Sequence, residues 1–231
     1  MLTAEHITKK YGKKEALHDL SFVLQDGTVN VLLGPNGAGK STMMKSIIGL
    51  LKYEGSIELD GISTKENEVR RKLGYIPELP ALYPNLTVRE HMEFIARVYN
   101  LKNYKDRMNS LLDRFEMTSQ EKKFGDELSK GMQQKLNLCL GLLPDPDFIL
   151  LDEPMIGLDP HAIKELKNLI LELKAQGKTI LISTHIIDSI ESLWDRTIIL
   201  AHGEIKADVT REESGERKLE DVFFAVTEEQ A

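Results

Sequence analysis

The sequence predicts an α/β fold: a P-loop NTPase core with a mostly parallel sheet, an N-terminal antiparallel β part and an inserted α-helical part. Three observations support this prediction. A glycine-rich segment at 34–41 fits the phosphate-binding pattern G-x-x-x-x-G-K-[ST] at every fixed position. Strand-like runs alternate with helical patterns on both sides of the middle of the chain, as in parallel sheets. Between them, residues 78–146 carry almost only helical periodicity.

The first part of the chain consists mainly of predicted strands. The apolar run at 28–33 is typical of a buried strand, and it leads directly into the glycine-rich segment. The pattern behind that segment predicts a helix whose positive N-terminal end faces a bound anion. The predicted elements are strands at 2–10, 16–25, 28–33, 55–61 and 73–77 and a helix at 41–51.

The helical insertion and the segments after it carry recognisable start signals. Thr87 and Glu90 form a capping box that opens a helix through 99. A second helix ends near 115, and a third begins near Ser129. Later, Asp159 is the expected N-cap of a helix with Pro160 at its first position. The remaining predictions are strands at 147–151, 179–183, 196–201 and 204–209 and helices at 160–176 and 186–194.

The length of 231 residues suits one large domain with internal parts. We predict an α/β core with its β part at 1–77 and 147–210, a helical subdomain at 78–146 and a short tail at 211–231. The apolar island at 222–224 is expected to pack on the body of the protein.

Composition limits the possible partners and location. The formal net charge is −7 without a long basic run, so no nucleic-acid partner is expected. The chain shows no apolar stretch long enough to span a membrane and no signal-peptide pattern, which predicts a cytoplasmic protein. The single cysteine, Cys139, lies in an apolar helical pattern and is expected to pack in the core.

The segment at 34–41 has the residue types that phosphate binding requires. Its glycines let the backbone turn tightly, so that successive N–H groups point at phosphate oxygens. Lys40 supplies a positive charge to the β- and γ-phosphates, and Ser41 offers a hydroxyl ligand to Mg²⁺. We therefore predict that the chain binds a nucleoside triphosphate. The predicted contact residues are Gly34, Pro35, Asn36, Gly37, Ala38, Gly39, Lys40, Ser41 and Thr42.

Two carboxylates, Asp152 and Glu153, follow the apolar run at 147–151. The carboxyl ends of parallel strands face the ligand crevice, on the side where the phosphate loop also lies. Asp152 is therefore expected to hold Mg²⁺ through water, and Glu153 to orient and deprotonate the attacking water. The alternative is a strand that simply ends in acidic turn residues. The metal requirement of phosphoryl transfer favours the functional interpretation beside a phosphate loop.

The segment at 128–135, LSKGMQQK, closely resembles the signature sequence of the nucleotide-binding subunits of ATP-binding cassette (ABC) transporters, with Lys130 and Met132 as variations. Ser129 caps the predicted helix and Gly131 permits close backbone approach, so this helix N-terminus is a second candidate anion site. The resemblance implies that Ser129 and Gly131 meet the γ-phosphate of an ATP molecule held by a second subunit. A capped surface helix is the alternative for this segment taken alone.

Other segments resemble elements of the same family in the same order. The resemblance implies that Tyr11 stacks on adenine, that Asp159 lies in a loop crossing the dimer interface, and that His185 contacts the γ-phosphate as a catalytic residue beside Lys40 and Glu153. Taken alone, Tyr11 is a turn tyrosine and Asp159 a helix cap; cap and interface roles are compatible.

Two positions depart from the family pattern. The family usually has glutamine where this chain has Glu78, although exporter-type members resemble it in carrying glutamate. A glutamate oxygen can still ligate Mg²⁺, but it lacks the N–H donors of the amide. Met155 stands where a small hydroxyl residue is common, and the sequence offers no physical account of its effect.

The resemblance covers essentially the whole chain and implies the ATPase motor of an ABC transporter. In this family two subunits, either two copies or two paralogues, close around two Mg-ATP and drive a separate integral-membrane permease. The permease is expected to dock near 78–99 and to hold the cassette peripherally at the cytoplasmic face of the cell membrane. The apolar residues of that segment, for which core packing is an equal alternative, are Leu79, Leu82, Tyr83 and Leu86.

The variation at Glu78, the short chain and the ending at 219–223 resemble the subgroup that exports drugs, lipids or polysaccharides. A soluble mechanical ATPase, for example of the iron–sulfur assembly type, is the alternative function and is compatible with the length. A kinase that uses the phosphate loop fits poorly, because no second substrate-binding insertion is evident.

Overall fold

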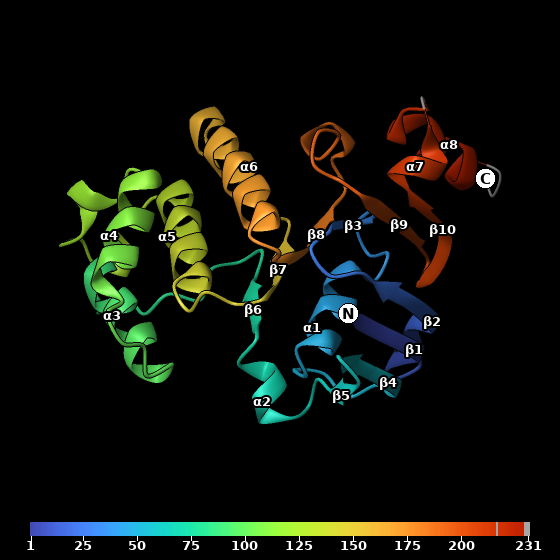
Figure 1. Cartoon of the computed structure of the whole chain (residues 1–231), viewed down its shortest axis with the longest axis horizontal. Coiled ribbons are helices and arrows are strands. Elements are labelled where there is room, and N and C mark those ends of the chain that lie inside the picture. Colours follow the sequence, from blue (N-terminus) through green and yellow to red (C-terminus); the bar gives the residue numbers. More distant parts are fainter. Residues whose placement is uncertain (216, 229–231) are drawn as a thin grey trace.

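The computed structural model describes residues 1–215 and 217–228, so the end of the predicted tail lies outside the described residues. It confirms the predicted α/β class, with an antiparallel and a mostly parallel sheet (Figure 1). The strands are β1 (Leu2–Tyr11), β2 (Lys14–Leu24), β3 (Val29–Leu33), β4 (Glu54–Leu59), β5 (Ile62–Ser63), β6 (Leu73–Ile76), β7 (Phe148–Asp152), β8 (Thr179–Thr184), β9 (Arg196–Ala201) and β10 (Glu204–Thr210). The helices are α1 (Lys40–Ile47), α2 (Asn67–Arg70), α3 (Val88–Val98), α4 (Lys105–Arg114), α5 (Lys130–Leu142), α6 (Pro160–Ala175), α7 (Arg211–Ser214) and α8 (Leu219–Glu228), with 3₁₀ turns η1 (Thr118–Gln120), η2 (Gly125–Glu127) and η3 (Ile187–Ser189).

The larger sheet has the strand order β10-β9-β3-β8-β7-β6, and all its neighbours pair in parallel except β10 and β9. Every residue of β3, β7 and β8 is buried. Helices or a second sheet cover both faces of such strands, which explains why their sequences are continuous apolar runs without alternation. Because β3, β7 and β8 run in the same direction, their carboxyl ends reach the same edge of the sheet.

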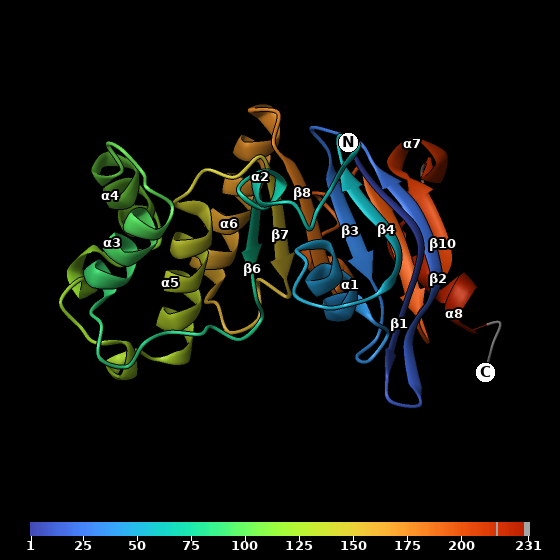
Figure 2. The same ribbon diagram turned by 90° about the horizontal axis from the view of Figure 1, so that it is seen from below.

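The smaller sheet, β2-β1-β4-β5, is antiparallel and lies beside the larger one together with α1 (Figure 2). Leu24 of β2, Met44 of α1 and Leu32 and Leu181 of the larger sheet belong to one buried cluster. Successive side chains of a strand point to opposite faces, so the neighbours of these leucines face the other side. The antiparallel sheet and α1 are thus packed on one face of the parallel sheet.

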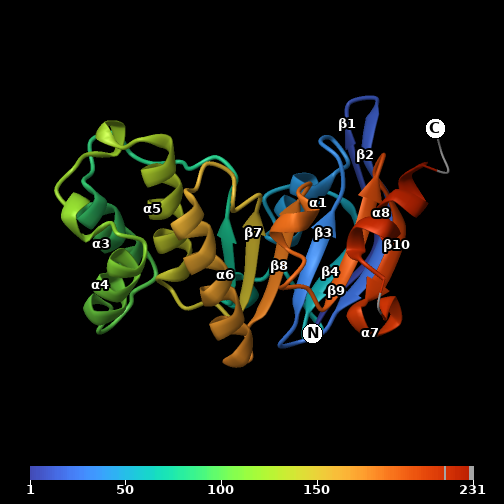
Figure 3. The same ribbon diagram turned by 90° about the horizontal axis from the view of Figure 1, so that it is seen from above.

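The opposite face of the larger sheet packs against the remaining helices. Ile182 of β8, Leu136 of α5, Leu166 of α6 and Met92 of α3 belong to one buried cluster. Helices α3, α4 and α5 lie together at the end of the molecule beyond β6 (Figures 1 and 3). The helical segment and the sheet therefore share an apolar core, and the domain boundaries drawn from the sequence stay a prediction.

The predicted helix starts are confirmed. The Thr87 side chain accepts from the Glu90 N–H, and the Glu90 carboxylate accepts from the Thr87 N–H, which completes the capping box of α3. Ser129 caps α5 by accepting from the Met132 N–H, and Asp159 caps α6 by accepting from the Ala162 N–H. Cys139 is fully buried in α5, as expected.

Two helix predictions are wrong in extent. The helix expected at 41–51 ends at Ile47, because Gly49 adopts a φ of +72° and the N–H groups of Gly49 and Leu50 turn back onto the last turn. The helix expected at 186–194 is only the turn η3. There the Thr184 hydroxyl accepts from the Ile186 N–H and the Ser189 hydroxyl donates to the Ile186 carbonyl, so side chains compete with helical backbone bonds.

The tail forms α7 and α8 along β10. Val222 and Phe223 pack against the core as expected, whereas Phe224 is exposed. Within the part of the chain that the structure describes, no helix combines the length and the apolar character needed to cross a membrane.

Candidate nucleotide-binding site

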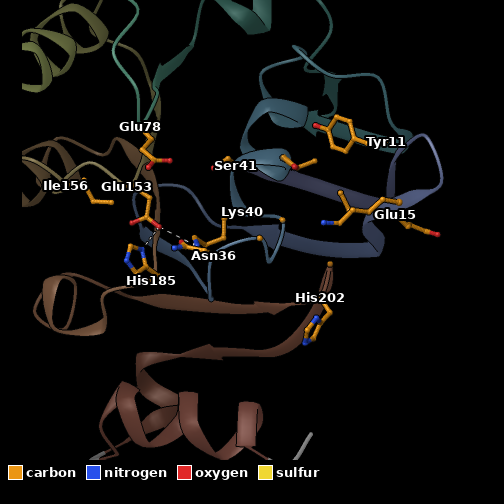
Figure 4. Close-up of a pocket in the computed structure, with 16 residues that line it drawn as sticks. Tyr11, Glu15, Asn36, Lys40, Ser41, Glu78, Glu153, Ile156, His185 and His202 are labelled. Atoms are coloured by element: carbon orange, nitrogen blue, oxygen red, sulfur yellow. Dashed lines mark hydrogen bonds and ion pairs between the residues drawn. The ribbon is translucent and has the colours of Figure 1, made fainter. Parts of the chain in front are cut away.

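A cavity of about 780 Å³ opens at the edge where the carboxyl ends of β3, β7 and β8 meet (Figure 4). Its walls come from the β1–β2 hairpin, the glycine-rich loop with α1, the loop after β6 and the turn between β9 and β10. The residues predicted from the sequence that line it are Tyr11, Asn36, Gly37, Gly39, Lys40, Ser41, Thr42, Glu78, Glu153 and His185. Gly34, Pro35 and Ala38 belong to the same loop but do not line the cavity.

The glycine-rich loop connects β3 to α1 and needs its glycines for two separate reasons. Gly37 and Gly39 have φ values of +82° and +111°, which side-chain-bearing residues rarely adopt. At Gly34, a Cβ atom would lie 2.1 Å from the Leu200 carbonyl oxygen, so only glycine fits there. The loop therefore presents its backbone at close range to the cavity, ahead of the N-terminal end of α1.

Lys40, the first residue of α1, is buried inside this loop. Its Nζ donates to the carbonyl oxygens of Gly34 at 2.7 Å and Pro35 at 3.2 Å, and it lies 3.4 Å from Glu153 Oε1. The ammonium group is therefore held at the floor of the cavity by three oxygen atoms. A buried positive charge in this place is suited to attract phosphate oxygens.

Asp152, at the end of β7, is surrounded by hydroxyl groups. Ser41 donates to its Oδ1 at 3.0 Å, Ser183 of β8 also donates to Oδ1, and Tyr75 of β6 donates to Oδ2 at 3.0 Å. Burial and the Asp152 charge raise the pKa of Tyr75 far above its usual value, so the phenol stays a donor. The carboxylate and the α1 hydroxyl are thus held next to each other.

These oxygen atoms fit a magnesium ion. Ser41 and Asp152 are in contact, and Glu78 lines the same cavity with an exposed carboxylate. Hydroxyl and carboxylate oxygens are the ligands that Mg²⁺ prefers, and it keeps several waters rather than requiring an all-protein cage. The described residues accordingly contain no cluster of three or more His, Cys, Asp or Glu side chains of metal-binding geometry.

Glu153 adopts a left-handed backbone conformation with a φ of +47°, which is unusual for a non-glycine residue. Its N–H donates to both the carbonyl and the hydroxyl oxygen of Ser183, each at 3.1 Å. Its Oε1 lies 2.9 Å from His185 Nδ1, while Oε2 has no hydrogen-bond partner among the described residues. A carboxylate that is only 5 % exposed, lines a polar cavity and keeps one oxygen without a hydrogen-bond partner among the described residues is suited to accept a proton from bound water.

Tyr11 closes the cavity at the end of β1. Its ring is about half exposed, and Lys9 Nζ lies 5.0 Å from the ring centroid. Figure 4 places it across the cavity from Glu153 and His185. A half-exposed aromatic ring that lines the same cavity as the phosphate loop is suited to stack on a nucleobase.

Besides Gly34, Pro35 and Ala38, the predicted residues that do not line the cavity are Asp152, which lies behind Ser41, and Ser129, Gly131 and Asp159. Ser129 and Asp159 act as helix caps, and Gly131 packs against the loop that follows β7, where a Cβ atom would lie 2.9 Å from the Gly157 carbonyl oxygen. Their contact with nucleotide across a dimer stays a prediction.

Other cavity residues were not predicted from the sequence. Part of the wall comes from the start of β2, from the loop after β7 and from the turn between β9 and β10; these residues are Lys14, Glu15, Ala16, Ile156, His202 and Gly203. The supporting residues Tyr75 and Ser183 were also missed. The position of each at or near the carboxyl end of a predicted strand was the available signal.

A phosphate loop with a buried lysine, beside two carboxylates at the end of a neighbouring parallel strand, defines a P-loop nucleoside triphosphatase. A family model described as "ABC transporter" matches residues 17–156, which is more than half of the chain. The chain therefore belongs to the ABC transporter family of ATP-binding proteins, which hydrolyse ATP.

Relatives and solved structures agree with this assignment. The chain is 38 % identical to the ABC-type transporter ATP-binding protein EcsA of Bacillus subtilis, over 100 % of this chain and 98 % of EcsA. It is 35 % identical to the lantibiotic transport ATP-binding protein SrtF of Streptococcus pyogenes, over 96 % of both proteins.

Among solved structures, an ATP-binding subunit of an ABC transporter superposes with a TM-score of 0.92 at 35 % identity, covering 98 % of this chain and 99 % of that one. A dimeric post-hydrolysis state of the ATP-binding cassette MJ0796, bound to ADP and Pi, superposes with a TM-score of 0.83 at 28 % identity. It covers 91 % of this chain and 98 % of the other.

Proposed function

We propose that the chain is the ATP-hydrolysing motor subunit of an ABC transporter: two subunits close around two Mg-ATP, and hydrolysis drives a separate membrane-spanning permease. The observation that carries this proposal is the arrangement of Lys40, Glu153 and His185 around one cavity, with Asp152 bonded to the cavity residue Ser41, in a chain that matches transporter subunits along its full length. These full-length relatives favour a transporter over a soluble mechanical ATPase.

Each residue has a distinct part in the proposed reaction. The backbone of the glycine-rich loop and Lys40 bind the β- and γ-phosphates, while Tyr11 stacks on the adenine. Ser41, Glu78 and, through water, Asp152 would hold Mg²⁺, which supplies charge neutralisation at the phosphates when bound. Glu153 orients the attacking water and accepts its proton.

His185 would hold Glu153 and approach the γ-phosphate. Its Nδ1 lies within hydrogen-bond distance of Glu153 Oε1, so its second ring nitrogen, Nε2, is left for another partner. In the proposed dimer, Ser129 and Gly131 of the second subunit cover the γ-phosphate from the opposite side, and Asp159 lies at the interface. The dimeric cassette with ADP and Pi supports this arrangement.

The proposed permease surface is the segment at 78–99. Leu79 is 78 % exposed and Tyr83 is 54 % exposed, with Phe94 in edge-to-face contact with Tyr83. Such an exposed apolar group is typical of a protein contact. Leu82 packs on the core instead. Through this contact the subunit would sit at the cytoplasmic face of the membrane, and the lantibiotic transport function named for SrtF supports export as the direction.

Co-purification tests the proposal. The tagged chain is purified from detergent-solubilised membranes of its own host, and we expect a hydrophobic, multi-span protein to purify with it, together with Mg-ATPase activity. A Leu79→Ser, Tyr83→Ser double variant should lose the partner. Leu171→Ser is the matched control, since Leu171 is an exposed leucine of α6 outside the 78–99 segment. A chain that hydrolyses ATP but associates with no multi-span protein would contradict the transporter assignment.

A further inference from the structure

Lys135 joins the signature-like segment to the loop that follows Glu153. It lies on α5 and is only 11 % exposed at its side chain. Its Nζ lies 2.8 Å from Asp159 Oδ2 and 3.5 Å from Glu116 Oε2. The ammonium group therefore connects the helical insertion to the first residue before α6.

The loop from Glu153 to Asp159 is held by hydrogen bonds between its own backbone groups. The Ile156 N–H donates to the Glu153 carbonyl at 3.2 Å, and the Leu158 N–H donates to the Met155 carbonyl at 3.4 Å. At its end, Asp159 Oδ1 accepts from the Ala162 N–H while Oδ2 faces Lys135. The Asp159 carboxylate and Glu153 therefore lie at the two ends of one short loop that is held by its own backbone hydrogen bonds.

The same helix face makes a second contact with this loop. Gly131 lies four residues before Lys135, so both point to the same side of α5. A Cβ atom at Gly131 would lie 2.9 Å from the Gly157 carbonyl oxygen, so the two backbones touch. Backbone contact at one end and an ion pair one turn later fix both the distance and the angle between helix and loop.

We propose that Lys135 is a positioning residue for ATP hydrolysis, which holds the 129–135 segment and the 153–159 loop as one unit. The inference rests on the proposed functions of Ser129 and Glu153. Lys135 does not line the nucleotide cavity. It keeps the general base of its own subunit in fixed relation to the helix tip that meets the other subunit's nucleotide.

The ion pair also affects its acidic partner. The contact with Lys135, followed by the capping bond from Ala162, lowers the pKa of Asp159 below its usual value. The carboxylate therefore stays ionised and available to Lys135 at neutral pH. Glu116 adds a second, more exposed oxygen on the side of the helical insertion.

The test compares Lys135→Met with a matched control, Lys178→Met. Methionine keeps most of the aliphatic stem and removes the charge. Lys178 has a side chain that is 14 % exposed and also faces two carboxylates, Asp147 at 3.0 Å and Asp145 at 3.4 Å, but at the opposite end of β7. We measure kcat and KM for ATP, the Kd for ATP and the melting temperature of both variants, with Lys135→Arg as the conservative variant.

We expect Lys135→Met to lower kcat by about tenfold or more with the Kd for ATP nearly unchanged, because misplacing a catalytic group costs rate rather than ground-state binding. Lys135→Arg should recover most of the rate. Lys178→Met should match the loss of melting temperature but keep kcat within about twofold, because its ion pairs lie at the opposite end of β7 from the site and only stabilise the fold. Equal kcat values in the two methionine variants overturn the proposal.

Two further measurements separate this inference from the proposed function. If Glu153→Gln forms an ATP-dependent dimer and the wild type hydrolyses ATP, the proposed function stands whatever Lys135→Met does. If Lys135→Met does not fold, Asp159→Asn replaces it, because asparagine keeps the helix cap and removes the charge that Lys135 meets. A wild-type kcat in Asp159→Asn then overturns the proposal.

Discussion

Replacing Glu153 by glutamine tests the centre of the proposed mechanism. Glutamine has nearly the same size, so the strained backbone and the Ser183 contacts are kept, while the proton acceptor is lost. General-base catalysis contributes about 10²- to 10⁴-fold. We therefore expect kcat to fall by at least about 10²-fold, which corresponds to roughly 2.7 kcal/mol at 1.36 kcal/mol per factor of ten.

The same substitution should not weaken ATP binding. Glu153 Oε1 lies 3.4 Å from Lys40 Nζ, and at an effective dielectric constant of about 20 their attraction is about 5 kcal/mol before solvation costs. Glu153 thus competes with phosphate oxygens for Lys40. Removing its charge leaves Lys40 free, so the Kd for ATP should stay equal or fall.

Phosphate release measures kcat, calorimetry measures the Kd for ATP, and sizing with Mg-ATP measures dimer formation. ATP that is bound but not cleaved should trap the Glu153→Gln dimer. Glu165→Gln, which removes one acidic charge outside the cavity, serves as the control. A fall in kcat of less than about tenfold would refute the general-base assignment, and a strictly monomeric profile with ATP would refute the dimer.

Three other substitutions probe the site and the core. Lys40→Ala should weaken ATP binding by about tenfold to a hundredfold, because a hydrogen bond to a charged group contributes about 1.5–3 kcal/mol; an unchanged Kd in calorimetry would overturn its phosphate role. Glu78→Gln should keep Mg-dependent ATPase activity within about tenfold, since an oxygen ligand remains, and complete loss of phosphate release would contradict this. Leu136→Ala, at a fully buried position of α5, should lower the free energy of unfolding by about 2–5 kcal/mol; a urea-melt value below about 1 kcal/mol would disagree with its burial.

The sequence predicted the parts of the fold that depend on local rules. The phosphate loop, the caps at Thr87, Ser129 and Asp159 and the buried strands follow from residue types at fixed spacing, and the structure has them at the expected positions. The helix predicted at 186–194 was wrong because the apolar residues of this segment, such as Trp194, are buried by tertiary packing rather than along a helix face. Hydrophobic spacing alone cannot distinguish these cases.

The site was predictable where its residues belong to a strand-end or loop motif. The contribution of His202 and Gly203 was not, because it depends on β9 lying next to β3, a pairing between segments far apart in the chain. The contact between Lys135 and Asp159 could not be predicted from the sequence for the same reason. Long side chains reach partners that only the packing of α5 against the loop brings near.

Ser183 fixes the relative positions of three side chains of the site, and this geometry is set when the protein folds. Its hydroxyl donates to Asp152 and accepts from the Glu153 N–H, and His185 lies two residues further along the chain, directly after β8 ends at Thr184. One rigid strand thus sets the spacing between the metal-side carboxylate, the proton acceptor and the histidine. The entropy of ordering this corner is lost once, when the protein folds, rather than in every catalytic cycle.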